Sequence, residues 1–198
     1  MIASTTSAQV DWVGTSIGGL IGIVLAGVPG SPIRRLVIND IGPSVPAAAA
    51  FRVCEKLTRM PQQFETFDSA LDYFRADFST YGNLEDNHWA HIVHHSIEWT
   101  EEHSRYRVLL DRNVSHAFNM FHYYSVSLWH FWKNIKIPVL ILAGEKSDFL
   151  PLALAKEMQS QNPNARLLLV PGVGHMPMLM QPDQITPILE FLLEHEAV

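Results

Sequence analysis

The chain contains 198 residues, 47% of them hydrophobic and 17% charged, which is the composition of a globular protein and excludes a disordered, collagen-like or coiled-coil chain. Its 14 Lys and Arg face 20 Asp and Glu, so the formal net charge is −6. This balance argues against nucleic-acid binding, which depends on cations that neutralise phosphates. The single cysteine, Cys54, allows no intramolecular disulfide and fits a reducing compartment, so we expect a cytoplasmic protein.

The longest apolar stretch, residues 17–28, is too short to cross a membrane, because a transmembrane helix needs about 20 apolar residues. Residues 1–16 contain no Lys or Arg, whereas a secretory signal peptide begins with a positively charged region. We therefore expect a buried helix and no membrane span.

Four short aliphatic runs predict buried strands, at residues 10–14, 35–40, 138–144 and 166–170. Their apolar residues are nearly continuous, as expected of parallel strands that helices cover on both faces. Segments of helical length lie at residues 17–28, 152–161 and 183–195. Asp183 follows a proline and can cap the last helix. The alternation predicts an α/β fold: a mostly parallel sheet with helices on both faces.

The segment between the second and third predicted strands, residues 44–133, breaks this alternation. It holds all five Tyr, eight of the ten Phe and eight of the ten His. Residues 67–78 and 87–99 have the spacing of apolar residues that is typical of helices. We therefore predict that residues 44–133 form an inserted helical cap, on a core of residues 1–43 and 134–198.

A G-x-S-x-G pattern, Gly14-Thr15-Ser16-Ile17-Gly18, lies between the first predicted strand and the helix that follows it. A serine on such a tight turn projects its hydroxyl out of the sheet. Small residues at Gly14 and Gly18 avoid clashes with the neighbouring strand and helix, and the Ile17 N–H can help to stabilise an oxyanion. The pattern predicts a nucleophile at Ser16; the alternative is a glycine-rich turn that only packs a helix onto a sheet.

A nucleophilic serine needs a histidine base and a carboxylate that orients it. Asp148, in the loop after the third predicted strand, is the favoured carboxylate because a loop tip has the necessary reach. The alternatives are Glu145, which abuts the strand end, and Asp40, which suits a turn cap after the second strand. The favoured base is His175, because Gly and Pro residues before it form a loop that can bend back over the sheet.

The motifs resemble those of the α/β-hydrolase superfamily, in its branch of cap-bearing serine esterases. The matching segments are GTSIGG after VDWV, SDFL after PVLILAGEK, and PGVGH before the last helix, in the order nucleophile, acid, base. The resemblance covers nearly the whole chain. It implies that Ser16 attacks an acyl carbon, that His175 is the general base and that Asp148 holds the imidazole. It implies no metal or organic cofactor.

The chain departs from this family at its N-terminus, where the strands that precede the serine strand in complete members are lacking. The turn that supplies the second oxyanion donor in complete members lies among these strands, so it is lacking too. We therefore expect either a truncated hydrolase, or a short form that completes its sheet with a partner, for example as a homodimer through the exposed edge of the serine strand.

Three histidines, His88, His91 and His95, share one face of a predicted helix with a spacing that can bind zinc. The neighbouring Trp89 and Val93 indicate packing instead, and no cysteine is nearby, so no metal site is expected.

The sequence thus predicts a serine hydrolase of small to medium, rather apolar carboxylic esters. A carbon–carbon bond hydrolase and a thioesterase stay open, because they use the same three residues and differ in pocket shape. A hypothesis from another class is a non-catalytic fragment of this fold that binds a ligand or a partner.

Overall fold

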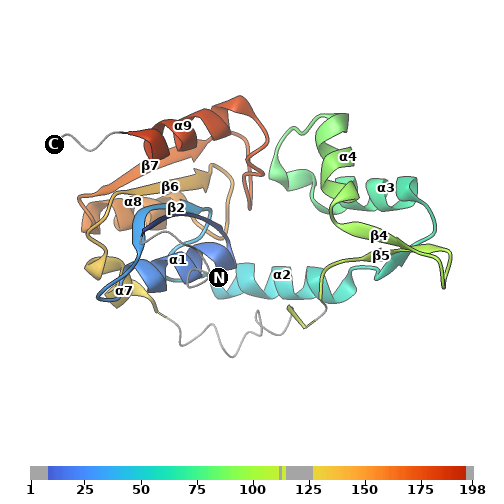
Figure 1. Ribbon diagram of the computed structural model, residues 1–198, viewed down its shortest axis with the longest axis horizontal. Coiled ribbons are helices and arrows are strands. Elements are labelled where there is room, and N and C mark those ends of the chain that lie inside the picture. Colours follow the sequence, from blue (N-terminus) through green and yellow to red (C-terminus); the bar gives the residue numbers. More distant parts are fainter. Residues whose placement is uncertain (1–8, 112, 115–126, 195–198) are drawn as a thin grey trace. The chain divides into compact units, whose positions relative to one another are not determined.

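The computed structural model describes residues 9–111, 113–114 and 127–194 (Figure 1). The chain divides into two compact units. Unit 1 combines Met1–Pro46 with Val126–Val198, and unit 2 is the inserted segment Ala47–Ser125.

Unit 1 is built on a four-stranded parallel sheet with the strand order β1-β2-β6-β7. The strands are β1 (Val10–Thr15), β2 (Ile33–Asn39), β6 (Val139–Gly144) and β7 (Ala165–Val170). In the register of the sheet, Gly14 lies opposite Ile38, and Ile38 lies opposite Ile141. Because the strands run in one direction, their carboxyl ends meet at one edge, which is where α/β proteins place their ligands.

Helices cover both faces of this sheet, which confirms the predicted fold class. They are α1 (Ile17–Ala26), α7 (Trp129–Asn134), α8 (Leu152–Gln161) and α9 (Pro182–Leu193). Gly22 of α1 lies against Leu36 of β2, whereas Val37 packs with Ile188 and Phe191 of α9. Since successive side chains of a strand point to opposite faces, α1 and α9 lie on opposite sides of the sheet (Figure 1).

Helix α7 belongs to unit 1, although the predicted cap extends to residue 133. Gly27, at the end of α1, lies against the backbone of Phe131. Trp132 is fully buried, and its indole N–H donates to the Met158 carbonyl of α8 at 3.0 Å. Trp132 of α7 therefore belongs to the core of unit 1, although the sequence analysis grouped it with the aromatic residues of the inserted segment.

Unit 2 contains a second sheet as well as helices. Its helices are α2 (Ala47–Arg59), α3 (Phe67–Asp77), the 3-10 turn η2 (Ser79–Tyr81) and α4 (Asp86–His94). Its strands, β3 (Gln63–Phe64), β4 (Ile97–Thr100) and β5 (Arg105–Val108), form an antiparallel sheet in the order β3-β5-β4. Phe64, Phe74 and Val93 are among the buried residues that hold the unit together.

The predicted helix over residues 87–99 was wrong at its C-terminal end, because α4 ends at His94 and residues 97–99 belong to β4. The Ser96 hydroxyl donates to the Ile92 carbonyl at 2.7 Å, just after α4 ends. Trp99 then pairs across the strands with Tyr106, and the two rings meet edge to face at a centroid distance of 5.1 Å. This pairing between strands decides the conformation, and helical spacing within one segment cannot reveal it.

The last helix begins differently from its prediction. Gln181 is the N-cap residue, Pro182 is the first residue of α9, and Asp183 lies within the first turn, where its charge complements the helix dipole. Within the described part of the chain, no helix is both long and apolar enough to cross a membrane.

The close contact between Gly27 and α7 predicts that a larger residue at position 27 destabilises the protein. A Cβ at Gly27 would lie 2.6 Å from the Phe131 carbonyl oxygen, which is backbone and cannot rotate away. We expect Gly27→Ala to lower the free energy of unfolding by about 1–3 kcal/mol in urea denaturation followed by circular dichroism. Gly18→Ala is the matched control, because a Cβ at Gly18 meets nothing within 4 Å and alanine favours the helix by about 0.5–1 kcal/mol. Equal stability of both variants would contradict the close packing of α1 and α7.

Candidate active site

Ser16 lies alone between the end of β1 and the start of α1, in a backbone conformation that non-glycine residues rarely adopt. Its φ is 50° and its ψ is −119°. Such a conformation costs about 1–3 kcal/mol and persists only where its surroundings hold it. The Ser16 N–H donates to the Asn39 carbonyl at 3.1 Å, and its own carbonyl accepts from the Gly19 N–H at 2.8 Å. Ile17 is the first residue of α1, so its N–H is among the helix donors that have no partner within the helix.

The glycines around Ser16 do not all have the role that the sequence predicts. A Cβ on Gly14 would lie 2.7 Å from the Gly19 nitrogen and closer still to the Gly18 carbonyl, so the turn requires a glycine there. A Cβ on Gly19 would collide with Ile41. A Cβ on Gly18 meets nothing within 4 Å in this structure. The constraint on residue size therefore lies at Gly14 and Gly19 and not at Gly18.

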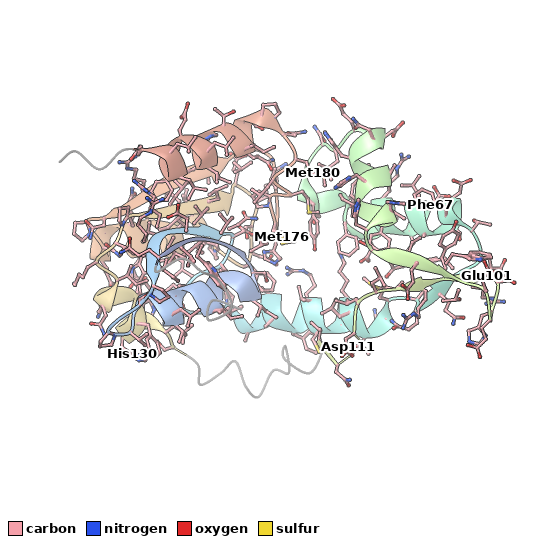
Figure 2. All side chains as sticks on the ribbon, viewed as in Figure 1. Phe67, Glu101, Asp111, His130, Met176 and Met180 are labelled. Carbon is pink, nitrogen blue, oxygen red and sulfur yellow. The ribbon has the colours of Figure 1, made fainter. Side chains whose placement is uncertain are left out.

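His175 lies in the loop between β7 and α9 and is 9% exposed. Its Nδ1 is 2.7 Å from Oδ2 of Asp40. The Phe149 ring stacks on the imidazole at a centroid distance of 3.9 Å and an interplanar angle of 17°. The same loop continues through Met176 and Met180, which Figure 2 labels. The imidazole is thus held by a carboxylate at one nitrogen and by a ring against one face.

Asp40 directly follows β2 and is completely buried. Its φ is 56°, so the chain turns sharply where the strand ends. The Gly144 N–H donates to Oδ1 at 2.9 Å, and the Ser147 hydroxyl donates to Oδ2 at 2.7 Å. With His175, three groups from two other segments, the end of β6 with its loop and the loop after β7, surround this carboxylate. A buried carboxylate needs such partners, because it has lost its hydration.

His175 Nδ1 makes its hydrogen bond with Asp40, whereas the sequence favoured Asp148. Asp148 and Glu145 are exposed, and Glu145 accepts from the Gly172 N–H at 2.8 Å. The expectation for Asp148 assumed that the histidine sits above the sheet within reach of a loop tip. The histidine is instead buried, and in the 144–150 loop it is Ser147 that turns inward. The buried end of β2 therefore supplies the carboxylate that contacts the imidazole.

Three further residues of the site were not among the predicted site residues. Ser147 and Phe149 flank Asp148 in the SDFL segment after β6, in which the sequence analysis assigned a role only to the aspartate. Asn39 is buried at the end of β2 and donates from Nδ2 to Thr15 Oγ1 at 3.1 Å and to the Pro177 carbonyl at 2.8 Å. A polar pair, Asn39-Asp40, directly after an apolar strand is the pattern that could have identified this region.

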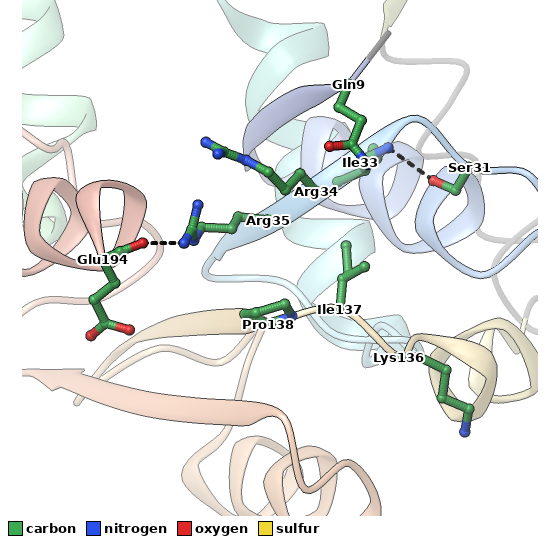
Figure 3. Close-up of a pocket in the computed structure, with 9 residues that line it drawn as sticks. All are labelled: Gln9, Ser31, Ile33, Arg34, Arg35, Lys136, Ile137, Pro138 and Glu194. Atoms are coloured by element: carbon green, nitrogen blue, oxygen red, sulfur yellow. Dashed lines mark hydrogen bonds between the residues drawn. The ribbon is translucent and has the colours of Figure 1, made fainter. Parts of the chain in front are cut away.

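A cavity of about 590 Å³ lies at the other end of the sheet (Figure 3). Its lining residues are Gln9, Ser31, Ile33, Arg34, Arg35, Lys136, Ile137, Pro138 and Glu194. Arg35 donates to the Glu194 carbonyl, and a hydrogen bond from Arg166 lowers the pKa of the exposed Glu194 carboxyl. Because β2 runs from this cavity to Asp40, about 20 Å of strand separates it from the histidine. It is not part of the candidate active site.

The histidines of α4 have contacts that explain their spacing. His88 Nδ1 accepts from the Glu85 N–H at the helix start, and His95 Nδ1 lies 2.9 Å from the His91 carbonyl. Over the described residues, no group of three or more His, Cys, Asp or Glu side chains could hold a metal ion.

The model of the alpha/beta hydrolase family matches residues 2–187, and the chain belongs to that family. The 3-hydroxybutyrate-oligomer hydrolase of Cupriavidus necator is 31% identical over 201 residues, which cover 96% of this chain and 67% of that protein. An alpha/beta hydrolase from Novosphingobium aromaticivorans superposes with a TM-score of 0.83 at 25% identity, over 96% of this chain and 67% of that chain.

The likeness of the fold extends to more distant proteins. An esterase from Mycobacterium tuberculosis superposes with a TM-score of 0.68 at 19% identity, over 98% of this chain and 64% of that chain. At this identity the likeness shows the fold alone. The chain spans about two thirds of the length of these relatives.

The hydrogen bonds of the Ser147 hydroxyl predict that this side chain stabilises the protein. Its hydroxyl donates to Asp40 and accepts from the N–H groups of Phe149 and Leu150, at 3.2 and 3.1 Å. We expect Ser147→Ala to lower the free energy of unfolding by about 1–3 kcal/mol in urea, because two buried donors lose their acceptor. Ser160→Ala is the control, since this serine is exposed on α8 and its loss should change stability by less than about 0.5 kcal/mol. Full stability of Ser147→Ala would show that the hydroxyl does not hold the loop.

Proposed function

We propose that this chain is a serine hydrolase of carboxylic esters in which Ser16, His175 and Asp40 form the catalytic triad. The observation that supports this most is the buried contact of 2.7 Å between His175 Nδ1 and Asp40 Oδ2. A second is the strained turn that presents Ser16 at the carboxyl edge of the same sheet. In this proposal Asp40 replaces Asp148 as the acid.

The proposed mechanism follows from the tautomer that Asp40 favours. The Nδ1–H group of His175 donates a hydrogen bond to the Asp40 carboxylate and keeps its proton, which leaves Nε2 unprotonated and able to act as a base. Ser16 Oγ attacks the ester carbonyl carbon and its proton passes to Nε2, while the oxyanion accepts a hydrogen bond from the Ile17 N–H. The imidazolium then protonates the leaving alcohol, and Ser16 is left acylated.

Deacylation repeats these steps with water as the nucleophile. His175 takes a proton from the water, whose oxygen attacks the acyl carbon, and the carboxylic acid leaves as Ser16 regains its proton. The Asp40 carboxylate stays ionised throughout and stabilises the imidazolium in both halves of the reaction. The mechanism requires neither a metal nor an organic cofactor.

For the substrate we propose small, rather apolar esters. The relative from Cupriavidus necator is named for oligomers of 3-hydroxybutyrate, which are chains of ester bonds, and short hydroxyacid oligomers are therefore part of this class. We propose that unit 2 acts as the cap that selects the acyl group. Thioester and carbon–carbon bond cleavage stay open, because the same three residues support them.

A non-catalytic role is the second candidate, and the edge of β1 favours it. Among the described residues, β1 pairs with β2 alone, and Val13 on this strand is 45% exposed. An apolar strand with an open edge tends to pair with another chain. We propose that, in this non-catalytic role, the chain binds a second copy of itself through the edge of β1 and forms a homodimer.

Chemical labelling of Ser16 separates the two candidates. We expect a fluorophosphonate to add a single adduct to the purified chain, measured by intact mass, because a general base makes Ser16 unusually nucleophilic. Ser16→Ala should lose both the adduct and the hydrolysis of p-nitrophenyl esters, whereas Ser160→Ala should keep both. If the folded wild-type chain forms no adduct, the hydrolase proposal is refuted and the non-catalytic binding role remains.

A pair of carboxylate variants identifies the acid. We expect Asp40→Asn to lower kcat for p-nitrophenyl acetate by about 10⁴, since an amide favours the wrong tautomer of the histidine. The exposed Asp148→Asn should stay within about threefold of the wild type. A large loss in Asp148→Asn with normal turnover by Asp40→Asn would restore the assignment that the sequence favoured.

A further inference from the structure

Asn39 connects the turn that carries Ser16 with the loop that carries His175. It is the last residue of β2 and is completely buried. Its backbone carbonyl accepts from the Ser16 N–H at 3.1 Å, and its Nδ2 donates to Thr15 Oγ1 at 3.1 Å. The same Nδ2 donates to the carbonyl of Pro177, two residues after the histidine, at 2.8 Å. One side chain thus contacts both segments.

The orientation of this amide follows from its partners. The Pro177 carbonyl can only accept a hydrogen bond, so the nitrogen of the Asn39 amide faces it and the oxygen points elsewhere. That oxygen, Oδ1, is buried and has no hydrogen-bond partner in the described part of the chain. A buried acceptor without a donor is destabilising. Packing alone would favour an apolar side chain at this position. The hydrogen bonds of the amide to the two active-site segments are therefore the better explanation for Asn39.

Asp40 and Asn39 hold the histidine loop at two separate points. Asp40 contacts the imidazole at Nδ1, and a ring held at a single nitrogen can still shift with its backbone. Asn39 holds that backbone at Pro177 and, on its other side, the residue before the nucleophile. An error of about 1 Å between reacting groups can cost about 10²-fold in rate.

We propose that Asn39 is a positioning residue that sets the distance between the Ser16 hydroxyl and the His175 imidazole. The inference rests on the proposed function, since it assumes that these two side chains react together. Asn39 itself touches neither the substrate nor the reacting atoms. Its contribution is to join the two loops whose relative placement determines whether Ser16 can pass its proton to Nε2.

The test uses two variants of similar shape and a partial control. Asn39→Leu removes the donor, and Asn39→Asp replaces it with a group that repels the Pro177 carbonyl. We expect each to lower kcat for p-nitrophenyl acetate by about 10²-fold and to slow fluorophosphonate labelling of Ser16 to a similar extent, with KM within about threefold of the wild type. Thr15→Val removes only the contact with the serine turn and should lower kcat by less than about tenfold.

A proton NMR spectrum distinguishes positioning from a general loss of structure. We expect the proton between His175 Nδ1 and Asp40 to give a signal far downfield in the wild type, and to keep it in Asn39→Leu because Asp40 is unchanged. Loss of the signal together with activity would overturn the proposal, since Asn39 would then support the fold of the site as a whole. Labelling of both Asn39 variants at the wild-type rate would overturn it while leaving the hydrolase intact. If wild-type Ser16 is not labelled at all, the proposed function fails and this inference fails with it.

Discussion

The buried carboxylate of Asp40 is the constraint on which the active-site end of unit 1 depends. A carboxyl group with no exposure to water must find hydrogen-bond partners within the protein, and Asp40 finds them in Gly144, Ser147 and His175. These partners come from the end of β6, the loop after it and the loop after β7. Satisfying one carboxylate therefore brings three segments together, and the catalytic arrangement that we propose is a consequence of this requirement.

The position of Asp40 in the sheet explains how one side chain can reach so many segments. Strand β2 lies between β1 and β6, so the residues at its carboxyl end have neighbours on both sides. Asn39 holds the serine turn and the Pro177 carbonyl, and Asp40 holds the loop after β6 and the imidazole. Two consecutive residues thus organise opposite halves of the site. An acid on an outer loop, such as Asp148, lacks this central position.

The local sequence pattern was sufficient to predict most of the secondary structure of unit 1. The four strands, α1, α8 and the strand-to-helix turn at Ser16 follow from apolar runs, glycines and their order, because these elements depend on residues that are close in sequence. Local pattern was insufficient in unit 2, where β4 exists only because it pairs with β5. It also failed for α7, which the aromatic composition assigned to the inserted segment although its Trp132 is buried in the core of unit 1.

The sequence by itself determined the fold class and the family, and it proposed Ser16 for the attack and His175 for the proton transfer. It also named Asp40, but only as an alternative, since a carboxylate after a strand suits a turn as well as a buried site. The tertiary structure brings Asp40, which lies 135 residues from the histidine in sequence, to 2.7 Å from it in space, and this contact supports our proposal of Asp40. The physical reason is burial: which carboxylate loses its water and must pair with the imidazole depends on how distant segments pack, and no local pattern records it.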